Sequence, residues 1–285
     1  MPGSPDTATL AGRELRLPRG ESGRSAMDVA RRCSAVAGEM LRQFFEERTI
    51  TVSWKGDRNP VTQADTATEH AIVALLQEEF PAHAVLAEES GGRIQAGWLW
   101  LIDPLDGTRN FASGVPHFAF NLALCHDGAP VIGLTLDPML EEEFVAVRGH
   151  GATLNGDPIR ASSATGLHEA VVGAGLGYDV GRAAELLTGL QALWGSVQAL
   201  RICGSAALDL AYTAAGRFDL FLHADVYPWD IAPAIVLIEE AGGLITTGAL
   251  CSDPADGVTI ESRNVVAGGQ AVLADLAARR ATAPA

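Results

Sequence analysis

Basic residues are scarce in this chain. It carries 20 Lys and Arg against 35 Asp and Glu in 285 residues, which gives a formal net charge of -15. Such a chain repels the phosphates of nucleic acids and of anionic membranes on average, so we expect neither as a partner. The same charge would also repel a small phosphate ester, unless bound cations reversed the sign of the field locally.

Long apolar runs and paired cysteines are also missing. No stretch approaches the ~20 apolar residues of a membrane span. The four cysteines, Cys33, Cys125, Cys203 and Cys251, form no CxxC pair and lack the spacing of a zinc knuckle. Since we find no secretory signal, we expect reduced thiols and a cytoplasmic location. The hydrophobic share of 48% still allows a sizeable core.

Periodicity and composition divide the chain into three parts. Residues 1–24 are rich in Pro, Gly, Ser and Arg, and we expect a disordered lead-in there. Residues 25–165 predict an α+β sub-domain, with two helices followed by alternating segments typical of antiparallel strands. Residues 166–285 alternate strands with helices and predict an α/β sub-domain. We expect the two sub-domains to pack into one layered body of mixed α+β and α/β class.

The strongest chemical signal is the segment DPLDGT at 103–108, directly after the apolar run WLWLI. Asp103 and Asp106 would repel each other, so one must be protonated or both must share a cation. Magnesium fits because it prefers oxygen ligands, and the carbonyl of Leu105 offers another oxygen. Gly107 allows the backbone to approach a ligand closely. A solvated acidic turn is the alternative interpretation of this motif.

Three further acids follow predicted strands or begin predicted helices. Glu88 comes after a short apolar strand, which a polar loop would also explain. Asp65 and Asp230 lie at helix starts, where the helix dipole stabilises acids without any metal. Asp230 nevertheless begins a very apolar helix, and a partly buried carboxylate there needs a cation. Residues 204–206 (GSA) begin another helix and offer free N–H groups to an anion, unless Ser205 is only an N-cap.

Together these signals suit phosphoryl chemistry with two metal ions. Ions ~3.5–4 Å apart clamp a phosphate and lower the pKa of a bound water. The following segments resemble those of a known protein family: NPVTQADTATE at 59–69, AEES at 87–90, WLIDPLDGTRNFASGVPHF at 100–118, GSAALDLAYTAAGRFDLF at 204–221 and PWDIAPAIVLIEEAGG at 228–243. Through them the chain resembles, from about 25 to 270, the inositol monophosphatase family of lithium-sensitive, magnesium-dependent sugar phosphatases.

The resemblance implies a layered αβαβα sandwich, a homodimer and a role for each matched residue. The implied oxygen ligands of two Mg²⁺ ions, and of a weaker third, come from Glu88, Asp103, Leu105, Asp106, Asp230 and Asp65. Glu88 and Thr108 match the residues that orient the attacking water, and Asp65 pairs with Thr108. The N–H groups of Gly107 and Thr108 would hold the phosphate. The implied neighbours of the substrate alcohol are Gly204, Ser205 and Ala206.

One departure from the family pattern bears on the substrate. Seven residues before Asp230, inositol-specific members carry a glutamate that binds substrate hydroxyls, and here this position is His223. His223 either contacts substrate or is only a strand-end residue. The segment KGDRNPVT at 55–62 resembles relatives that act on histidinol phosphate or 3′-phosphoadenosine nucleotides, whereas TRNF at 108–111 favours the inositol branch. Fructose bisphosphate also stays open, so we expect a small phosphorylated alcohol of the inositol-1-phosphate kind.

Other functional classes fit the sequence less well. A haloacid-dehalogenase-type phosphatase needs DxDx[TV] after an early strand, and the glycine-rich stretch at 173–177 lacks the third glycine of a dinucleotide loop because Tyr178 occupies that position. A non-enzymatic partner protein with a phosphatase fold is the remaining alternative, and the complete set of acids argues against it. The expected activity needs magnesium, is inhibited by lithium and by excess calcium, and rises toward alkaline pH because the attacking water must lose a proton.

Overall fold

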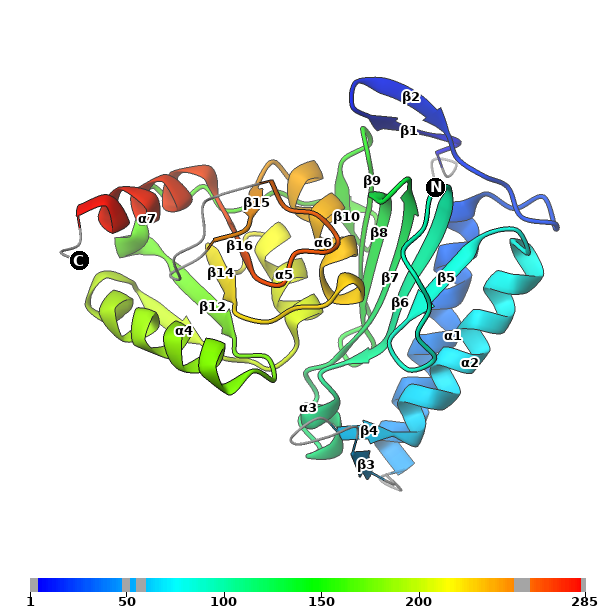
Figure 1. The fold of residues 1–285 in the computed structure, drawn as a ribbon, viewed down its shortest axis with the longest axis horizontal. Helices are drawn as coiled ribbons and strands as arrows, with labels where there is room; N and C mark the ends of the chain where they lie inside the picture. Colours follow the sequence, from blue (N-terminus) through cyan, green and yellow to red (C-terminus); the bar gives the residue numbers. More distant parts are fainter. Residues whose placement is uncertain (1–4, 48–51, 55–59, 249–256, 283–285) are drawn as a thin grey trace.

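The computed structural model describes residues 5–47, 52–54, 60–248 and 257–282 (Figure 1). Cys251 and most of the segment 55–62 therefore lie outside the described residues. Cys33, Cys125 and Cys203 are free thiols. Among the helices that the structure describes, none is both long and apolar enough to cross a membrane.

The first sheet has seven strands in the order β11-β10-β9-β8-β7-β6-β5. Its strands are β5 (Ala84–Ala87), β6 (Trp98–Asp106), β7 (Ala119–His126), β8 (Ala129–Asp137), β9 (Glu142–Val147), β10 (Ala152–Leu154) and β11 (Asp157–Pro158). All neighbours are antiparallel except β5 and β6, which are parallel. A two-residue turn at Asp127 and Gly128, both with positive φ, joins β7 to β8.

Helices cover both faces of this sheet (Figure 1). On one face lie α1 (Ala26–Glu47) and α2 (Gln63–Glu79), and on the other lie α5 (Ala206–Ala214) and α6 (Pro228–Glu240). In β6, Trp100 and Ile102 pack on the α1/α2 side, while Leu99 and Leu101 pack on the α5/α6 side. Because both faces of β6 are buried, the strand appears in the sequence as an unbroken apolar run.

The second sheet has five strands in the order β13-β12-β14-β16-β15. Its strands are β12 (Val171–Gly175), β13 (Ala199–Arg201), β14 (Leu220–His223), β15 (Leu244–Thr246) and β16 (Val265–Gly268). Its outer face is covered by α4 (Val180–Leu193) and α7 (Gln270–Thr282), whose residues Leu186, Leu190 and Val272 join the core below. Short elements complete the chain: α3 (Thr108–Ala112) and two 3₁₀ turns, Leu167–Glu169 and Trp194–Ser196.

The layers therefore run helices, sheet, helices, sheet, helices, and the predicted αβαβα sandwich is confirmed (Figure 1). Helices α5 and α6 form the middle layer between the two sheets. The strands of the first sheet end at Pro158, and those of the second begin at Val171. A division into sub-domains near residue 165 stays a prediction.

The expectation of a disordered lead-in is wrong for the described part of residues 1–24. Strands β1 (Thr7–Leu10) and β2 (Arg13–Arg16) form an antiparallel hairpin, and the N–H of Thr9 donates to the carbonyl of Arg148 at 2.9 Å. Ala8 is 1% exposed and Leu17 is 3% exposed. Such a short segment has too little apolar area to order itself, so its order comes from contacts with distant parts of the chain. A second unpredicted pair is β3 (Val52–Trp54) with β4 (Pro60–Thr62).

Candidate active site

A cavity of about 200 Å³ opens where the ends of strands from both sheets meet the starts of α5 and α6. From the first sheet its wall includes Glu88, Asp103 and Asp106. From the second sheet and the helix starts come His223 and Asp230. Ends of strands and starts of helices are where layered α/β proteins bind ligands.

Three carboxylates converge at this cavity. Oxygens of Asp103, Asp106 and Asp230 lie within 4.8 Å of one another. The pairing of β6 with β7 is irregular between Asp103 and Asp106, where Pro104 has no N–H to donate to a ladder. The irregular stretch turns both acids toward the start of α6, and the N–H of Leu105 donates to Oδ1 of Asp103 at 3.0 Å.

Burial sets the protonation of these carboxyls. Burial raises the pKa of Asp103 well above its ordinary value, and the charges of Glu88, Asp106 and Asp230 raise it further. Burial likewise raises the pKa of Asp230, with the charge of Asp106 adding to it. The pKa of Asp106 rises to about 6 through burial, against hydrogen bonds from Ser205 and Ala207 that lower it. Carboxyl groups that raise one another's pKa values in this way would lose their protons when a divalent cation binds between them.

The donor set fits a magnesium ion. The side chains that cluster there are carboxylates, and Leu105 also lines the cavity, so the site offers oxygen ligands. Glu88 faces the same cavity just after β5. Its loop is held by Glu69, which is 1% exposed and accepts from the N–H groups of Glu89 and Ser90 at 2.7 Å each.

Asp65 lies one layer behind the cavity. It occupies the third position of α2, where its Oδ2 accepts from the N–H of Thr62 at 2.8 Å and from the hydroxyl of Thr62 at 2.6 Å. Thr62 and Asp65 thus form a capping box at the start of α2. Oδ1 of Asp65 accepts from the hydroxyl of Thr108 at 3.0 Å. Burial raises the pKa of Asp65 to about 6, and Asp65 reaches the cavity through Thr108, which lines it.

The start of α5 binds the carboxylate of Asp106. Ser205 is the N-cap, so the ordinary capping interpretation is correct, and its hydroxyl also donates to Asp106. The N–H of Ala207 donates to the same Oδ2 of Asp106 at 2.9 Å. The start of α6 does the same for Asp230, which accepts from the N–H of Tyr227 at 2.8 Å. Asp230 is the third residue of that helix, and Tyr227 is its N-cap.

Two functional residues were missed by sequence reasoning. Asn121, which is 0% exposed, donates from Nδ2 to the carbonyls of Trp229 at 2.7 Å and Asp230 at 3.0 Å. The hydroxyl of Thr135 donates to Oδ1 of Asn121 at 2.6 Å. These bonds fix the first turn of α6 to the central strands, with Asn121 paired opposite Asp103. The only signal in the sequence is one amide within the apolar strand FAFNLAL. Glu69 was missed for a similar reason, since it is one acid among several on a polar helix.

His223 ends β14 and lines the cavity, so it is both a strand-end residue and a wall residue. Burial lowers its pKa to about 4, and the ring is therefore neutral at physiological pH. The N–H of Asp225 donates to Nδ1 at 3.1 Å, which assigns the ring proton to Nε2. A side chain at Gly175 would overlap the imidazole, and one at Gly173 would crowd Phe218. The glycines of the stretch 173–177 thus serve close packing and not a dinucleotide.

Comparison with known proteins identifies the family. The sequence model of the inositol monophosphatase family matches residues 24–283. The chain belongs to the inositol monophosphatase family. A relative from Pseudomonas aeruginosa, named Nus factor SuhB, is 40% identical over 229 residues, which cover 77% of this chain and 84% of the relative. The inositol-1-monophosphatase of Rhizobium meliloti is 38% identical over 239 residues, with 82% and 88% covered.

A solved structure gives the same answer. The extragenic suppressor protein suhB from Bartonella henselae superposes with a TM-score of 0.81 at 34% identity, covering 88% of this chain and 96% of that one. The family resemblance stated from the sequence is therefore confirmed, and the chain is a phosphatase of the inositol monophosphatase family. Members of this family act on small phosphate monoesters and generally depend on metal ions.

Proposed function

We propose that this protein is a Mg²⁺-dependent phosphomonoesterase that hydrolyses a small phosphorylated alcohol of the inositol-1-phosphate kind by direct attack of water. The observation that carries the proposal is the cluster of Asp103, Asp106 and Asp230 at one cavity, within 4.8 Å of one another. The raised pKa values of these buried carboxyls support a role as metal ligands, because burial without a cation is unfavourable for their charged forms.

The residues that would hold two Mg²⁺ ions, and a weaker third, are Glu88, Asp103, Leu105, Asp106, Asp230 and Asp65. When bound, the ions would neutralise the acids, attract the phosphate and activate water. Asp65 contributes chiefly through Thr108, since its carboxylate is engaged by Thr62 and Thr108. We expect two ions to bind more tightly than the third for that reason.

Thr108 and Glu88 would orient the attacking water. The hydroxyl of Thr108 lies 3.0 Å from Oδ1 of Asp65 and 3.0 Å from the carbonyl of Leu105, and both are acceptors. Its single proton is therefore engaged by these two acceptors, and its lone pairs are left to accept a hydrogen bond from water. Glu88, which lines the same cavity, would supply a carboxylate oxygen. Water then attacks phosphorus directly, and no phosphoenzyme forms.

The phosphate would be held by the N–H groups of Gly107 and Thr108. Gly107 has a φ of 91°, and a Cβ there would lie 3.1 Å from the carbonyl oxygen of His117. Glycine is needed for this turn, which exposes the backbone toward the cavity. The alcohol would lie against Gly204, Ser205, Ala206 and His223, which line the same cavity.

The identity of the alcohol depends on His223. A neutral ring with its proton on Nε2 donates one hydrogen bond, whereas a glutamate would accept bonds from two hydroxyls. Asp225 also lines the cavity, but Arg263 binds its Oδ1 at 2.6 Å. Because this arrangement offers a polyol fewer acceptors, histidinol phosphate, fructose 1,6-bisphosphate and 3′-phosphoadenosine 5′-phosphate stay alternatives to a phosphate of the inositol kind.

A second candidate is a non-enzymatic role as a partner protein. It is favoured by the name Nus factor, which the Pseudomonas aeruginosa relative carries in place of an enzyme name. The complete set of acids at the cavity favours the enzyme. A homodimer, a cytoplasmic location, inhibition by lithium and the lack of nucleic-acid partners stay predictions.

The test is phosphate release from a panel of phosphate esters with Mg²⁺ present or chelated. We expect Mg²⁺-dependent turnover, fastest with inositol 1-phosphate, rising toward alkaline pH. The Asp103→Asn variant should lose it. Turnover that survives this substitution, or that falls above neutral pH while the fold is intact, would contradict the mechanism. A folded protein that hydrolyses no ester in the panel would favour the partner role.

A further inference from the structure

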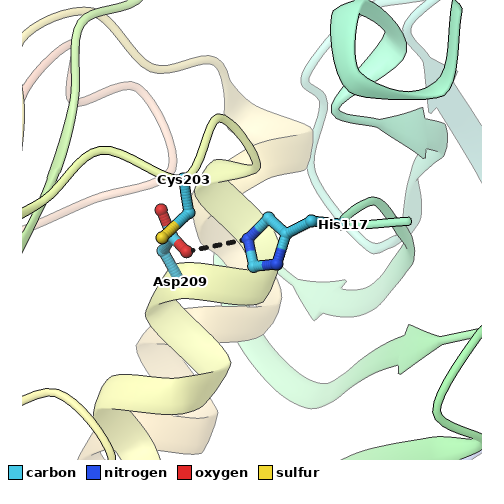
Figure 2. A group of neighbouring side chains, drawn as sticks. All are labelled: His117, Cys203 and Asp209. Carbon is cyan, nitrogen blue, oxygen red and sulfur yellow. Dashed lines mark hydrogen bonds and ion pairs between the residues drawn. The ribbon is translucent and has the colours of Figure 1, made fainter. Parts of the chain in front are cut away.

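A second cluster of ligand-type side chains lies outside the residues that line the cavity. His117 precedes β7, Cys203 precedes α5, and Asp209 is in the first turn of α5. One nitrogen, one sulfur and one oxygen from these residues lie within 4.8 Å of one another. Figure 2 shows the thiol of Cys203 and the imidazole of His117 both turned toward the carboxylate of Asp209. Two chain segments, one at 117 and one at 203–209, thus bring three different donor types to one point.

The carboxylate of Asp209 is not fully satisfied by the chain. Asp209 is 1% exposed, and its Oδ2 is buried with no hydrogen-bond partner among the described residues. Its Oδ1 contacts Nε2 of His117 at 3.0 Å. A buried carboxylate oxygen without a partner is unfavourable because it has lost its bonds to water and gained none from the chain. This orphan oxygen is evidence for a ligand that is independent of the clustering itself.

An ion pair between His117 and Asp209 explains only part of this arrangement. Burial lowers the pKa of His117, but the hydrogen bond and charge of Asp209 outweigh it, so the pKa is raised overall. That pair satisfies Nε2 and Oδ1. It leaves the second oxygen of Asp209 beside the thiol of Cys203, which is a weak donor, and this contact lowers the pKa of Asp209 only in part against burial. Burial raises the pKa of Cys203 to about 11, so the thiol is protonated until a metal replaces its proton.

We propose that His117, Cys203 and Asp209 bind a thiophilic divalent transition metal of the Zn²⁺ class, separately from the magnesium cavity. Nitrogen, thiolate and carboxylate donors together suit Zn²⁺, whereas Mg²⁺ prefers oxygen alone. Three protein ligands leave a fourth position for water. Binding releases the thiol proton of Cys203 to solvent, and His117 binds as a neutral imidazole, with no change in oxidation state.

The surrounding bonds connect this site to the cavity wall. Nδ2 of Asn110 donates to the carbonyls of His117 and Cys203 at 2.8 Å each, so one amide already joins the two ligand-bearing loops. Ser205, two residues after Cys203, donates to Asp106. An ion bound here would therefore fasten α5 to the loop before β7 at the edge of the cavity.

The test uses Co²⁺ as an optical probe for Zn²⁺, titrated into the full-length, reduced protein in saturating Mg²⁺. We expect one equivalent to bind with a thiolate-to-cobalt charge-transfer band, and Zn²⁺ to displace it. Cys203→Ser should abolish the band and weaken Zn²⁺ binding by at least about tenfold. The matched controls Cys33→Ala and Cys251→Ser should keep both. His117→Gln provides a second variant that should weaken binding without removing a thiol.

Several results would overturn the proposal. These are a cobalt spectrum without a thiolate band, binding by Cys203→Ser as tight as in the wild type, or loss of the band in a control variant. Asp103→Asn should keep the band, which separates this site from the magnesium cavity. Because the readout is metal binding, failure of the zinc site would leave the phosphatase proposal intact, and loss of turnover would leave the zinc site intact.

Discussion

Two groups of buried carboxylates behave in opposite ways in this molecule. Glu79, at the end of α2, is 4% exposed, and its carboxylate accepts from the N–H and hydroxyl of Ser22 at 3.2 and 2.6 Å. Arg24 and Arg32 contact it at 3.3 and 3.4 Å. The hydrogen bond from the Ser22 hydroxyl, together with the charge of Arg24, holds the pKa of Glu79 below its ordinary value despite burial. At the cavity, burial raises the pKa of Asp103, Asp106 and Asp230.

The difference shows that burial of an acid does not by itself indicate function. Around Glu79 the chain supplies its own cations, and the result is a fixed contact between α2 and residues 20–24. Around Asp103 the strongest neighbouring charges are other carboxylates. A group of the first kind stabilises the fold, whereas a group of the second kind needs a cation from solution. Substitutions in the two groups of carboxylates test this difference.

The largest effect is expected for Asp103→Asn on activity. Loss of a shared metal ligand should lower Mg²⁺-dependent phosphate release by more than about 100-fold. Glu79→Gln is the matched control, since it also neutralises a buried acid, and it should keep activity within about twofold because it touches no cavity residue. Steady-state kinetics at saturating Mg²⁺ make this comparison. Equal losses in both variants would erase the distinction between the two groups.

The pH dependence of stability should differ between chelated and Mg²⁺-loaded protein. The pKa of Asp65 and that of Asp106 are raised from 3.8 to about 6, so the folded chain binds more protons than the unfolded chain between these values. In chelator, the contribution of these two groups to the free energy of unfolding is therefore fully present below about pH 4. It is lost as the pH rises through 6, by on the order of 1–3 kcal/mol. Denaturant unfolding at pH 5 and pH 8 measures this. Mg²⁺ should remove the loss, and a chelated protein that is more stable at pH 8 would contradict the argument.

Glu79→Gln should lower the free energy of unfolding where Asp103→Asn in chelator raises it. Removing the charge of Glu79 leaves Arg24 and Arg32 without their partner, but their side chains are 51% and 47% exposed, so water compensates in part. We expect a loss of about 1–2 kcal/mol. Urea unfolding of both variants in chelator gives the two signs. The same sign in both would show that the charges at the cavity are already balanced.

The smallest effect is expected for His223→Glu, which adds one more carboxylate to those at the cavity. A carboxylate that accepts hydroxyl bonds should shift the kcat/KM ratio toward inositol 1-phosphate by about tenfold relative to the other esters. His223→Gln, neutral and of similar size, is the control and should leave the ranking as it is. An unchanged ranking in the glutamate variant would remove His223 from substrate recognition.

Much of the fold could be predicted because its signals are local. The helices over 26–47 and 63–79 and the meander of strands follow from apolar spacing and turn residues. The hairpin over 7–16 could not, since its order depends on contacts such as Thr9 with Arg148. The role of Asn121 could not be predicted for the same reason, because its amide binds the start of α6, which is distant in the sequence.

The sequence by itself determined most of the helices and strands, the family and the acidic character of the cavity. A capping box joins residues three apart, and the two acids of DPLDGT follow their strand directly, so short-range geometry settles both. Only the tertiary structure decided which acids share a site. Asp230 reaches Asp103 because α6 is packed between two sheets, and His117 reaches Asp209 because the loop before β7 lies against the start of α5. Such meetings depend on how distant segments bury their apolar faces against one another, which no local pattern encodes.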